Sequence, residues 1–516
     1  MTITGASTRN SLKSRDSSLA NLARLVGLAV IAFLVMGYHP GLEDDAFYLA
    51  AIKRDLNPAL FPHDSEFFRL QFQATIFDKL IAFSVRLTHL PLAWVVLIWQ
   101  FAAIFLLLYA CWRISRRLFA RSEAHWAAVA LIAALLSLPV PGISLNLVDQ
   151  YLHPRTLATA LILTAIVAIL DRRIWLAGVL LAVAFSIHAI MACLAVSFCV
   201  FLWWNLRGQR TRQGHWVAGN WIAAAALFPL SWLFEPATDA WRQAAATRDF
   251  YFLARWQWYE WLGVFAPLLI LFALQRLGVF RRAAENAALA ALTHALLAYF
   301  VFQTIAGVAV MLTPGLERLR PLEPMRYLHL FYLLFFLLAG GVIGQFVLRR
   351  HFYRWAILFV PLAAGMFYAQ RQMYPASAHL ELPFVKPTNP WLQAFDWIRG
   401  NTPVDALFAI DPHYMTLPGE DYHGFRALAE RSVLADYEKD GGMAARVPSL
   451  APRWVREVTA RKGWRSFQAA DFARLRRDFG VTWIVLSKAD RMYSTLDPAG
   501  MNCSYENRQV QVCRLY

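Results

Sequence analysis

Three adjacent carboxylates, Glu43, Asp44 and Asp45, are the side chains of this sequence best placed to do chemistry. They follow directly on the first long apolar segment of the chain. A charged side chain costs about 3 kcal/mol in the hydrocarbon of a bilayer, so we expect all three just outside it. Such a cluster can supply a general base, or hard oxygen ligands for a divalent cation, Mg²⁺ or Mn²⁺. The alternative is structural, with Asp44 or Asp45 capping the N-terminus of a helix.

A second polar group lies between two later apolar segments, where Asp149, His153 and Arg155 occur within seven residues. Arg155 opens an apolar segment and suits an anionic phosphate near the membrane surface. Asp149 and Asp45 are the predicted ligands of the cation. The alternative is a loop whose side chains satisfy the ends of the adjoining helices.

Single polar residues in apolar surroundings complete the candidates. His188 interrupts the apolar stretch 174–204, and we assign it to the substrate site; a hydrogen bond inside the bundle is the alternative. Arg320 and Arg326 precede a late apolar segment and are candidates for phosphate binding. Their alternative role is pairing with Glu317 and Glu323.

The composition explains why these residues stand out. Of 516 residues, 58% are hydrophobic and only 16% are charged, which indicates a polytopic membrane protein. The net charge of +16 comes largely from short basic clusters between apolar segments, so it points to cytoplasmic loops and not to nucleic acid. The sequence has no nucleotide-binding or zinc-protease motif that would support ATP-driven transport or proteolysis.

We predict an α-helical membrane protein with about eleven transmembrane helices. A cytoplasmic segment, 1–20, precedes a transmembrane domain, 21–370, and the stretch 174–204 forms two short helices that meet near His188. The basic clusters then share the cytoplasmic side. The outer side holds the loops 39–90, 141–155, 234–258 and 313–326. The expected spans are 21–38, 91–112, 124–140, 156–170, the two helices of 174–204, 216–233, 259–276, 286–312, 327–347 and 352–370.

The last part of the chain, 371–516, changes in composition and predicts a small extracytoplasmic α/β domain. Cys503 and Cys513 flank an expected hairpin, and outside the cytoplasm they can form a disulfide. The expected elements are a helix at 391–399 and strands at 406–410, 481–487 and 510–516.

This layout resembles the GT-C superfamily of membrane glycosyltransferases. Glu43-Asp44-Asp45 is similar to the acidic motif in the first outer loop of that superfamily, and Asp149 to its second acidic loop. Arg326 is similar to its phosphate-contacting arginines. The strings 395–403 and 426–434 look like those of uncharacterised bacterial GT-C-like membrane proteins. Around Asp149 the sequence lacks a second D-x-D or E-x-D motif.

The resemblance implies a bacterial inner-membrane enzyme with a cytoplasmic N-terminus and a periplasmic C-terminus. It implies transfer of a sugar from a polyprenyl-phosphate donor among membrane lipids. Asp44 or Asp45 would be the base, and Arg155, Arg326 or a divalent cation would stabilise the departing phosphate. A transporter or lipid-handling protein without catalysis is the alternative. The glycosyltransferase hypothesis expects Asp44 or Asp45, Asp149 and Arg326 to meet in one outer cavity.

Overall fold

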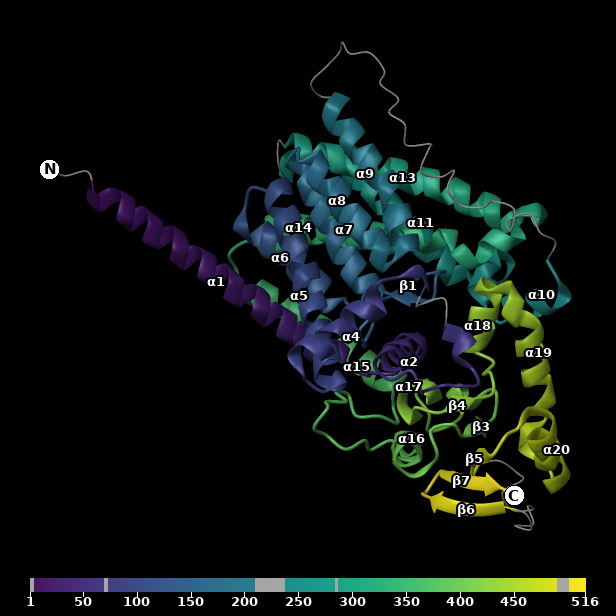
Figure 1. Ribbon diagram of the computed structural model, residues 1–516. Helices are drawn as coiled ribbons and strands as arrows, with labels where there is room; N and C mark the ends of the chain where they lie inside the picture. Colours follow the sequence, from purple (N-terminus) through teal and green to yellow (C-terminus); the bar gives the residue numbers. More distant parts are fainter. Residues whose placement is uncertain (1–3, 69–72, 209–236, 284–285, 490–500) are drawn as a thin grey trace.

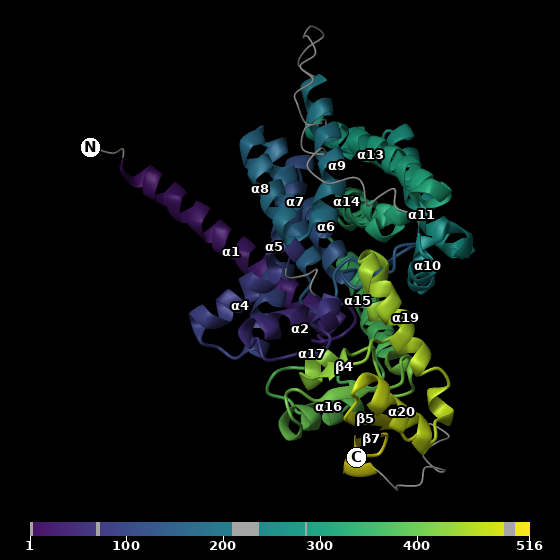
Figure 2. The same cartoon turned by 45° about the vertical axis from the view of Figure 1, so that its right-hand side comes forward.

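The molecule combines an apolar helix bundle with a smaller α/β region, and the short helix α2 (Asp45–Leu56) lies between them (Figure 1, Figure 2). A computed structural model describes residues 4–68, 73–208, 237–283, 286–489 and 501–516. In both views the long helix α1 (Thr4–Met36) extends away from the bundle at its N-terminal end.

The described residues include seven helices long and apolar enough to cross a membrane. The chain is therefore a mostly helical polytopic protein. The predicted span 216–233 lies outside the described residues, so the count of about eleven stays a prediction. The seven are α1, α5 (Leu92–Leu118), α9 (Ala189–Gly208), α11 (Trp258–Arg276), α13 (Ala287–Leu312), α14 (Tyr327–Ile343) and α15 (Phe352–Met373). Three shorter helices accompany them: α6 (Ser122–Ala134), α7 (Pro154–Leu170) and α8 (Ile174–Ile187).

The predicted break in the stretch 174–204 is present. Helix α8 ends at Ile187 and α9 begins at Ala189, with the backbone of His188 extended between them. The His188 ring accepts a hydrogen bond from the backbone N–H of Met191 at 3.4 Å, which caps the start of α9. A polar residue that can satisfy an open helix end therefore separates two apolar helices.

The basic clusters gather at one end of the bundle. Arg117 donates two hydrogen bonds to Asp171, joining the end of α5 to the turn between α7 and α8. Arg350 and Glu123 pair at 3.0 Å and join the α14–α15 turn to the start of α6. We call this the basic end; it comprises residues 113–121, 171–173 and 349–354. The compartment that it faces stays a prediction.

Helix α4 (Phe77–Thr88) is amphipathic. It buries Phe77 and Ile81 and exposes Phe83 and Leu87. An exposed apolar face beside membrane-spanning helices suits the bilayer interface.

The C-terminal region is built around a five-stranded mixed sheet with the order β4-β3-β5-β7-β6. Strand β3 runs parallel to β4 and β5, while β7 is antiparallel to β5 and β6. The predicted helix and three strands are all present. Helix α16 (Pro390–Asn401) packs on one face of the sheet and α20 (Ala469–Phe479) on the other. The strands are β3 (Leu407–Ala409), β4 (Ser432–Val433), β5 (Trp483–Ser487), β6 (Met501–Glu506) and β7 (Val510–Leu515).

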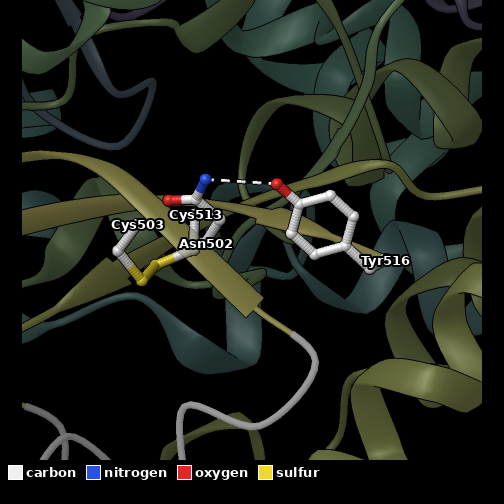
Figure 3. Close-up of a disulfide and its surroundings, with 4 residues drawn as sticks. All are labelled: Asn502, Cys503, Cys513 and Tyr516. Atoms are coloured by element: carbon white, nitrogen blue, oxygen red, sulfur yellow. Dashed lines mark hydrogen bonds between the residues drawn. A yellow bond between two sulfur atoms is a disulfide. The ribbon is translucent and has the colours of Figure 1, made fainter.

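Cys503 and Cys513 form the disulfide that the sequence allowed (Figure 3). They face each other in the register of β6 and β7. Beside the bond, the Asn502 side chain donates a hydrogen bond to the Tyr516 hydroxyl at 3.1 Å. The disulfide thus joins the edge strand β6 to β7.

The C-terminal region shares a core with the outer loops. Phe47 of α2 and Phe61 pack with Trp241 of α10 (Asp239–Ala246), Met443 of α18 (Lys439–Arg446) and Trp454 of α19 (Ala451–Ala460). The Trp241 indole also donates a hydrogen bond to the carbonyl of Ala445 at 2.8 Å. These contacts attach α18 firmly to the first outer loop.

We expect Gly424→Ala to weaken this attachment, because a Cβ at Gly424 would lie 2.7 Å from the Cα of Ala46 in α2. Backbone there cannot yield easily, so the substitution should destabilise the protein by about 1–3 kcal/mol. The measurement is thermal unfolding of the detergent-solubilised protein. Gly400→Ala is the control, because that Cβ meets open space. Equal unfolding midpoints for the two variants would contradict the expectation.

Candidate functional site

A cavity of about 400 Å³ lies between the α/β region and the end of the bundle opposite the basic end. All four predicted outer loops and the C-terminal region contribute to its wall, including the last residue of the fourth loop, Arg326. The lining includes Glu43, Asp44, Phe47, Asp149, Tyr151, Arg155, Arg248, Arg326, Tyr374, Tyr422, Glu438, Lys439 and Arg446. Asp44, Asp149 and Arg326 therefore meet in one cavity, as the glycosyltransferase hypothesis expects.

The local backbone separates the two aspartates. Glu43 adopts a left-handed conformation with φ of 51°, and α2 begins at Asp45. Asp44 occupies the N-cap position but makes no capping hydrogen bond with its side chain, and it lines the cavity. Asp45 is 2% exposed and accepts a hydrogen bond from the backbone N–H of Gly41 at 2.6 Å. Asp45 thus closes the turn that presents Asp44.

Lys439 of α18 neutralises the acidic turn. Its ammonium forms an ion pair with Glu43 and lies 3.1 Å from Asp44 Oδ1. Burial by itself would lower the pKa of Lys439, but Asp44 and Glu43 raise it. Burial would raise the pKa of Asp44, but Lys439 and the His153 ring hold it well below its usual range. Burial raises the pKa of Asp45 to about 7. At neutral pH Asp44 is therefore ionised, whereas Asp45 is only partly ionised.

His153 adds a neutral hydrogen-bond donor behind Asp44. Its Nδ1 accepts the backbone N–H of Arg155 at 2.9 Å, so the ring proton resides on Nε2, 3.8 Å from Asp44 Oδ2. Burial, together with the charge of Arg155, lowers the pKa of His153. The ring stacks on His188 with centroids 6.1 Å apart. His188 therefore supports His153 from behind, and it does not line the cavity.

Arg155 is the most deeply buried cation of the wall, with 1% of its surface exposed. Its Nη2 donates hydrogen bonds to both carboxylate oxygens of Asp149. Within the described part of the chain, its buried Nε and Nη1 have no hydrogen-bond partner. A buried donor without a partner destabilises the fold by about 1–3 kcal/mol, so a ligand or a water molecule that accepted from these N–H groups would be stabilised there. His153 also caps helix α7 by accepting from the backbone N–H of Arg155, as the structural alternative expects.

A second cationic pair shares one carboxylate. Glu323 forms an ion pair with Arg326, and Arg446 of α18 donates a hydrogen bond to the same carboxylate at 2.7 Å. Arg326 is 5% exposed and lines the cavity. Arg320 lies elsewhere, with its guanidinium 5.3 Å from the centroid of the Phe252 ring. Glu317 pairs with Arg242 at 3.2 Å.

The predicted cation ligands do not form a ligand set. Both oxygens of Asp149 accept from Arg155, and Asp45 is turned to Gly41. Across the described ranges, no group of three or more His, Cys, Asp or Glu side chains is arranged to hold a metal ion. Asp45 and Asp149 are thus both engaged within the protein, and binding of Mg²⁺ or Mn²⁺ stays a prediction.

Sequence reasoning missed the contribution of the C-terminal region to the wall. Lys439 and Glu438 lie in the charged run 436–440, and Arg446 ends the helix that Lys439 begins. A charged run is usually a solvated surface, and nothing in the sequence links it to a loop almost 400 residues earlier. Sequence reasoning also missed four further residues of the wall, because nothing local links them to the acidic turn: Tyr151, Arg248, Tyr374 and Tyr422.

The turn 420–424 anchors the acidic motif. The backbone N–H of Glu43 donates to the carbonyl of Tyr422 at 2.9 Å, and Gly424 N–H donates to the carbonyl of Gly41 at 2.8 Å. Tyr422 is left-handed, with φ of 66°. The acidic turn is therefore held by backbone pairing with the C-terminal region.

A buried cluster of histidines and glutamates supports this anchor. His423 lies 3.2 Å from both Glu381 and Glu420. His39, in the first outer loop, lies 3.0 Å from Glu381. Burial by itself would lower the pKa of His423, but Glu381 and Glu420 raise it to about 10. Burial would raise the pKa of Glu381, but His423 and His39 lower it to about 2.

A family model matches part of the chain. Residues 389–449 match the model of a family described as a domain of unknown function, DUF6798. The match runs from the start of α16 past the end of α18 and contains Tyr422, Glu438, Lys439 and Arg446. No curated protein matches the chain. The C-terminal wall of the cavity thus lies in the segment that the family model describes.

The His423 cluster predicts a pH dependence of stability. With a pKa raised from 6.5, His423 stabilises the fold fully below pH 6.5, and this contribution is lost as the pH rises toward 10. With a pKa lowered from 4.5, Glu381 contributes above pH 4.5, and its contribution is lost as the pH falls toward 2. The thermal unfolding midpoint should therefore fall between pH 6.5 and 10. His423→Gln should flatten this slope, whereas His351→Gln, at an exposed position, should not. Identical slopes in all three proteins would refute the assignment.

Proposed function

We propose that this chain is a membrane glycosyltransferase of the GT-C type. It transfers a sugar from a polyprenyl-phosphate donor to an acceptor hydroxyl on the outer face of the bacterial inner membrane. One observation carries the proposal: Asp44, an ionised carboxylate, shares one cavity wall with Arg155, and two buried guanidinium donors of Arg155 have no partner among the described residues. A base beside an anion site is what such a transfer needs.

In the proposed reaction, Asp44 takes the proton of the acceptor hydroxyl. The acceptor oxygen bonds to the anomeric carbon, and the bond from that carbon to the phosphate oxygen breaks. The phosphate oxygen keeps the electron pair, and polyprenyl phosphate leaves. Arg155 donates to the phosphate through Nε and Nη1, while Arg326 and Arg446 supply further positive charge from the wall.

Binding of the polyprenyl-phosphate sugar would also make Asp44 a stronger base. Lys439 holds the pKa of Asp44 low, and a carboxylate of low pKa is a weak base. A donor phosphate in this cavity competes with Asp44 for the Lys439 ammonium. As Lys439 turns to the phosphate, the pKa of Asp44 rises toward the working pH. Glu43 keeps Lys439 within reach through its own ion pair.

The position of the cavity suits a lipid-linked donor. Met373 and Tyr374 at the end of α15 contribute to its wall. Helix α15 buries few of its apolar side chains, so its outer surface is free to face lipid. A prenyl chain lying on this helix would bring its phosphate to the cavity.

We expect Asp44→Asn to reduce transfer of labelled sugar from a polyprenyl-phosphate donor by about 10²-fold or more, because the base is lost and the shape kept. Asp45→Asn should retain far more transfer, since an amide oxygen can still accept from Gly41. Asp396→Asn, a change at an exposed ion pair, is the control. Full sugar transfer by a folded Asp44→Asn variant would contradict the proposal. Substrate uptake into proteoliposomes without sugar transfer would favour the transporter alternative.

A further inference from the structure

A second hollow, of about 690 Å³, lies at the basic end of the bundle between α1 and α5. It shares no residue with the cavity at the opposite end. Its wall combines arginines, aromatic rings and leucines. The lining residues are Ser18, Asn21, Leu22, Leu25, Tyr109, Trp112, Arg113, Arg116, Arg117 and Asp171.

Positive charge exceeds negative charge in this hollow. Three arginines from the last turns of α5 face one carboxylate, and Asp171 is already engaged by two donors of Arg117. Arg113 donates to the Tyr109 hydroxyl at 3.1 Å, and Arg116 lies over the Trp112 ring at 4.8 Å. Among the residues whose side chains the structure describes, which begin at Ser18, Arg113 and Arg116 have no carboxylate partner within ion-pair distance. Their remaining donors are available to an anion.

Capping of α5 does not account for all three arginines. Cations are favoured near a helix C-terminus, and Arg117 donates to the carbonyl of Arg113 at 2.6 Å. Within the described part of the chain, the side chains of Arg113 and Arg116 donate to no backbone carbonyl. Two cations therefore remain beyond what the helix end uses.

The surface below the arginines is apolar. Leu106 lies seven residues before Arg113, about 10 Å along the helix, and it is exposed. Leu22 and Val26 of α1 are also exposed, one turn apart. From the end of α5 toward its middle, the order is thus guanidinium, aromatic ring and exposed leucine. This order matches a headgroup, an interfacial belt and acyl chains.

We propose that this hollow binds the headgroup of an anionic phospholipid. Arg113 and Arg116 contact the lipid phosphate, Tyr109 and Trp112 lie at the depth of the glycerol, and the acyl chains run over Leu106, Leu22 and Val26. A soluble phosphate would use the arginines alone and would leave the apolar strip uncovered. Basic hollows between membrane helices are suited to such headgroups.

The test uses the purified full-length protein in detergent and native mass spectrometry. Dioleoyl phosphatidylglycerol and dioleoyl phosphatidylcholine are titrated in parallel. We expect phosphatidylglycerol to bind more tightly than phosphatidylcholine. Arg113→Gln/Arg116→Gln should weaken the binding of phosphatidylglycerol by about thirtyfold, since each juxtamembrane arginine contributes roughly fivefold. The control is Arg276→Gln/Arg281→Gln, a double change outside the hollow, which should leave the binding of phosphatidylglycerol unchanged.

Three outcomes would overturn the proposal: equal binding of the two lipids, full binding by the Arg113/Arg116 variant, or displacement of the lipid by equimolar glycerol 1-phosphate. The last would identify a site for soluble phosphate. The unmodified protein offers a second readout, because added salt should weaken phosphatidylglycerol binding more than phosphatidylcholine binding. Equal salt dependence for both lipids would also contradict an arginine–phosphate contact.

Discussion

The ion pairs of Lys439 with Glu43 and Asp44 are the interaction on which the rest of the structure depends. Glu43 and Asp44 are partly buried, and carboxylates partly removed from water are stabilised by a paired cation. The cation that pairs with the acidic turn comes from almost 400 residues later in the chain. Helix α18 must therefore lie over α2. The shared aromatic core and the backbone pairing with the turn 420–424 both serve that position.

The same rule applies on the other side of α18. Asp440, the residue after Lys439, pairs with Arg426 at 2.9 Å, and Arg426 also pairs with Asp64 of the first outer loop. Consecutive residues of one helix thus hold two buried charge groups, one facing the cavity and one facing the α/β core. Breaking either pair would leave an uncompensated charge. The C-terminal region and the outer loop consequently form one folded unit around the cavity.

These long-range pairs also mark where sequence reasoning stops. Apolar patterning predicts the helices that are long enough to cross a membrane, and the length of the stretch 174–204 predicts a break near His188, because each signal is local. The meeting of Asp44, Asp149 and Arg326 follows from loops that share one end of a bundle. Lys439 carries no such signal, since a lysine in a charged run is ordinarily solvated. Its position depends on a fold that local patterns do not specify.

The choice between Asp44 and Asp45 was equally invisible, because adjacent aspartates have the same chemistry in sequence. The left-handed Glu43 decides it, since it turns one carboxylate to the cavity and the other to Gly41. The pKa values alone would favour Asp45, which lies nearer neutrality as a base. Geometry takes precedence, because a base must reach the proton it removes. In the proposed mechanism, the low pKa of Asp44 is then a property of the resting state. In that mechanism the phosphate of the proposed donor would draw Lys439 away from Asp44, so the donor would act on the same ion pairs that hold α18 over the acidic turn.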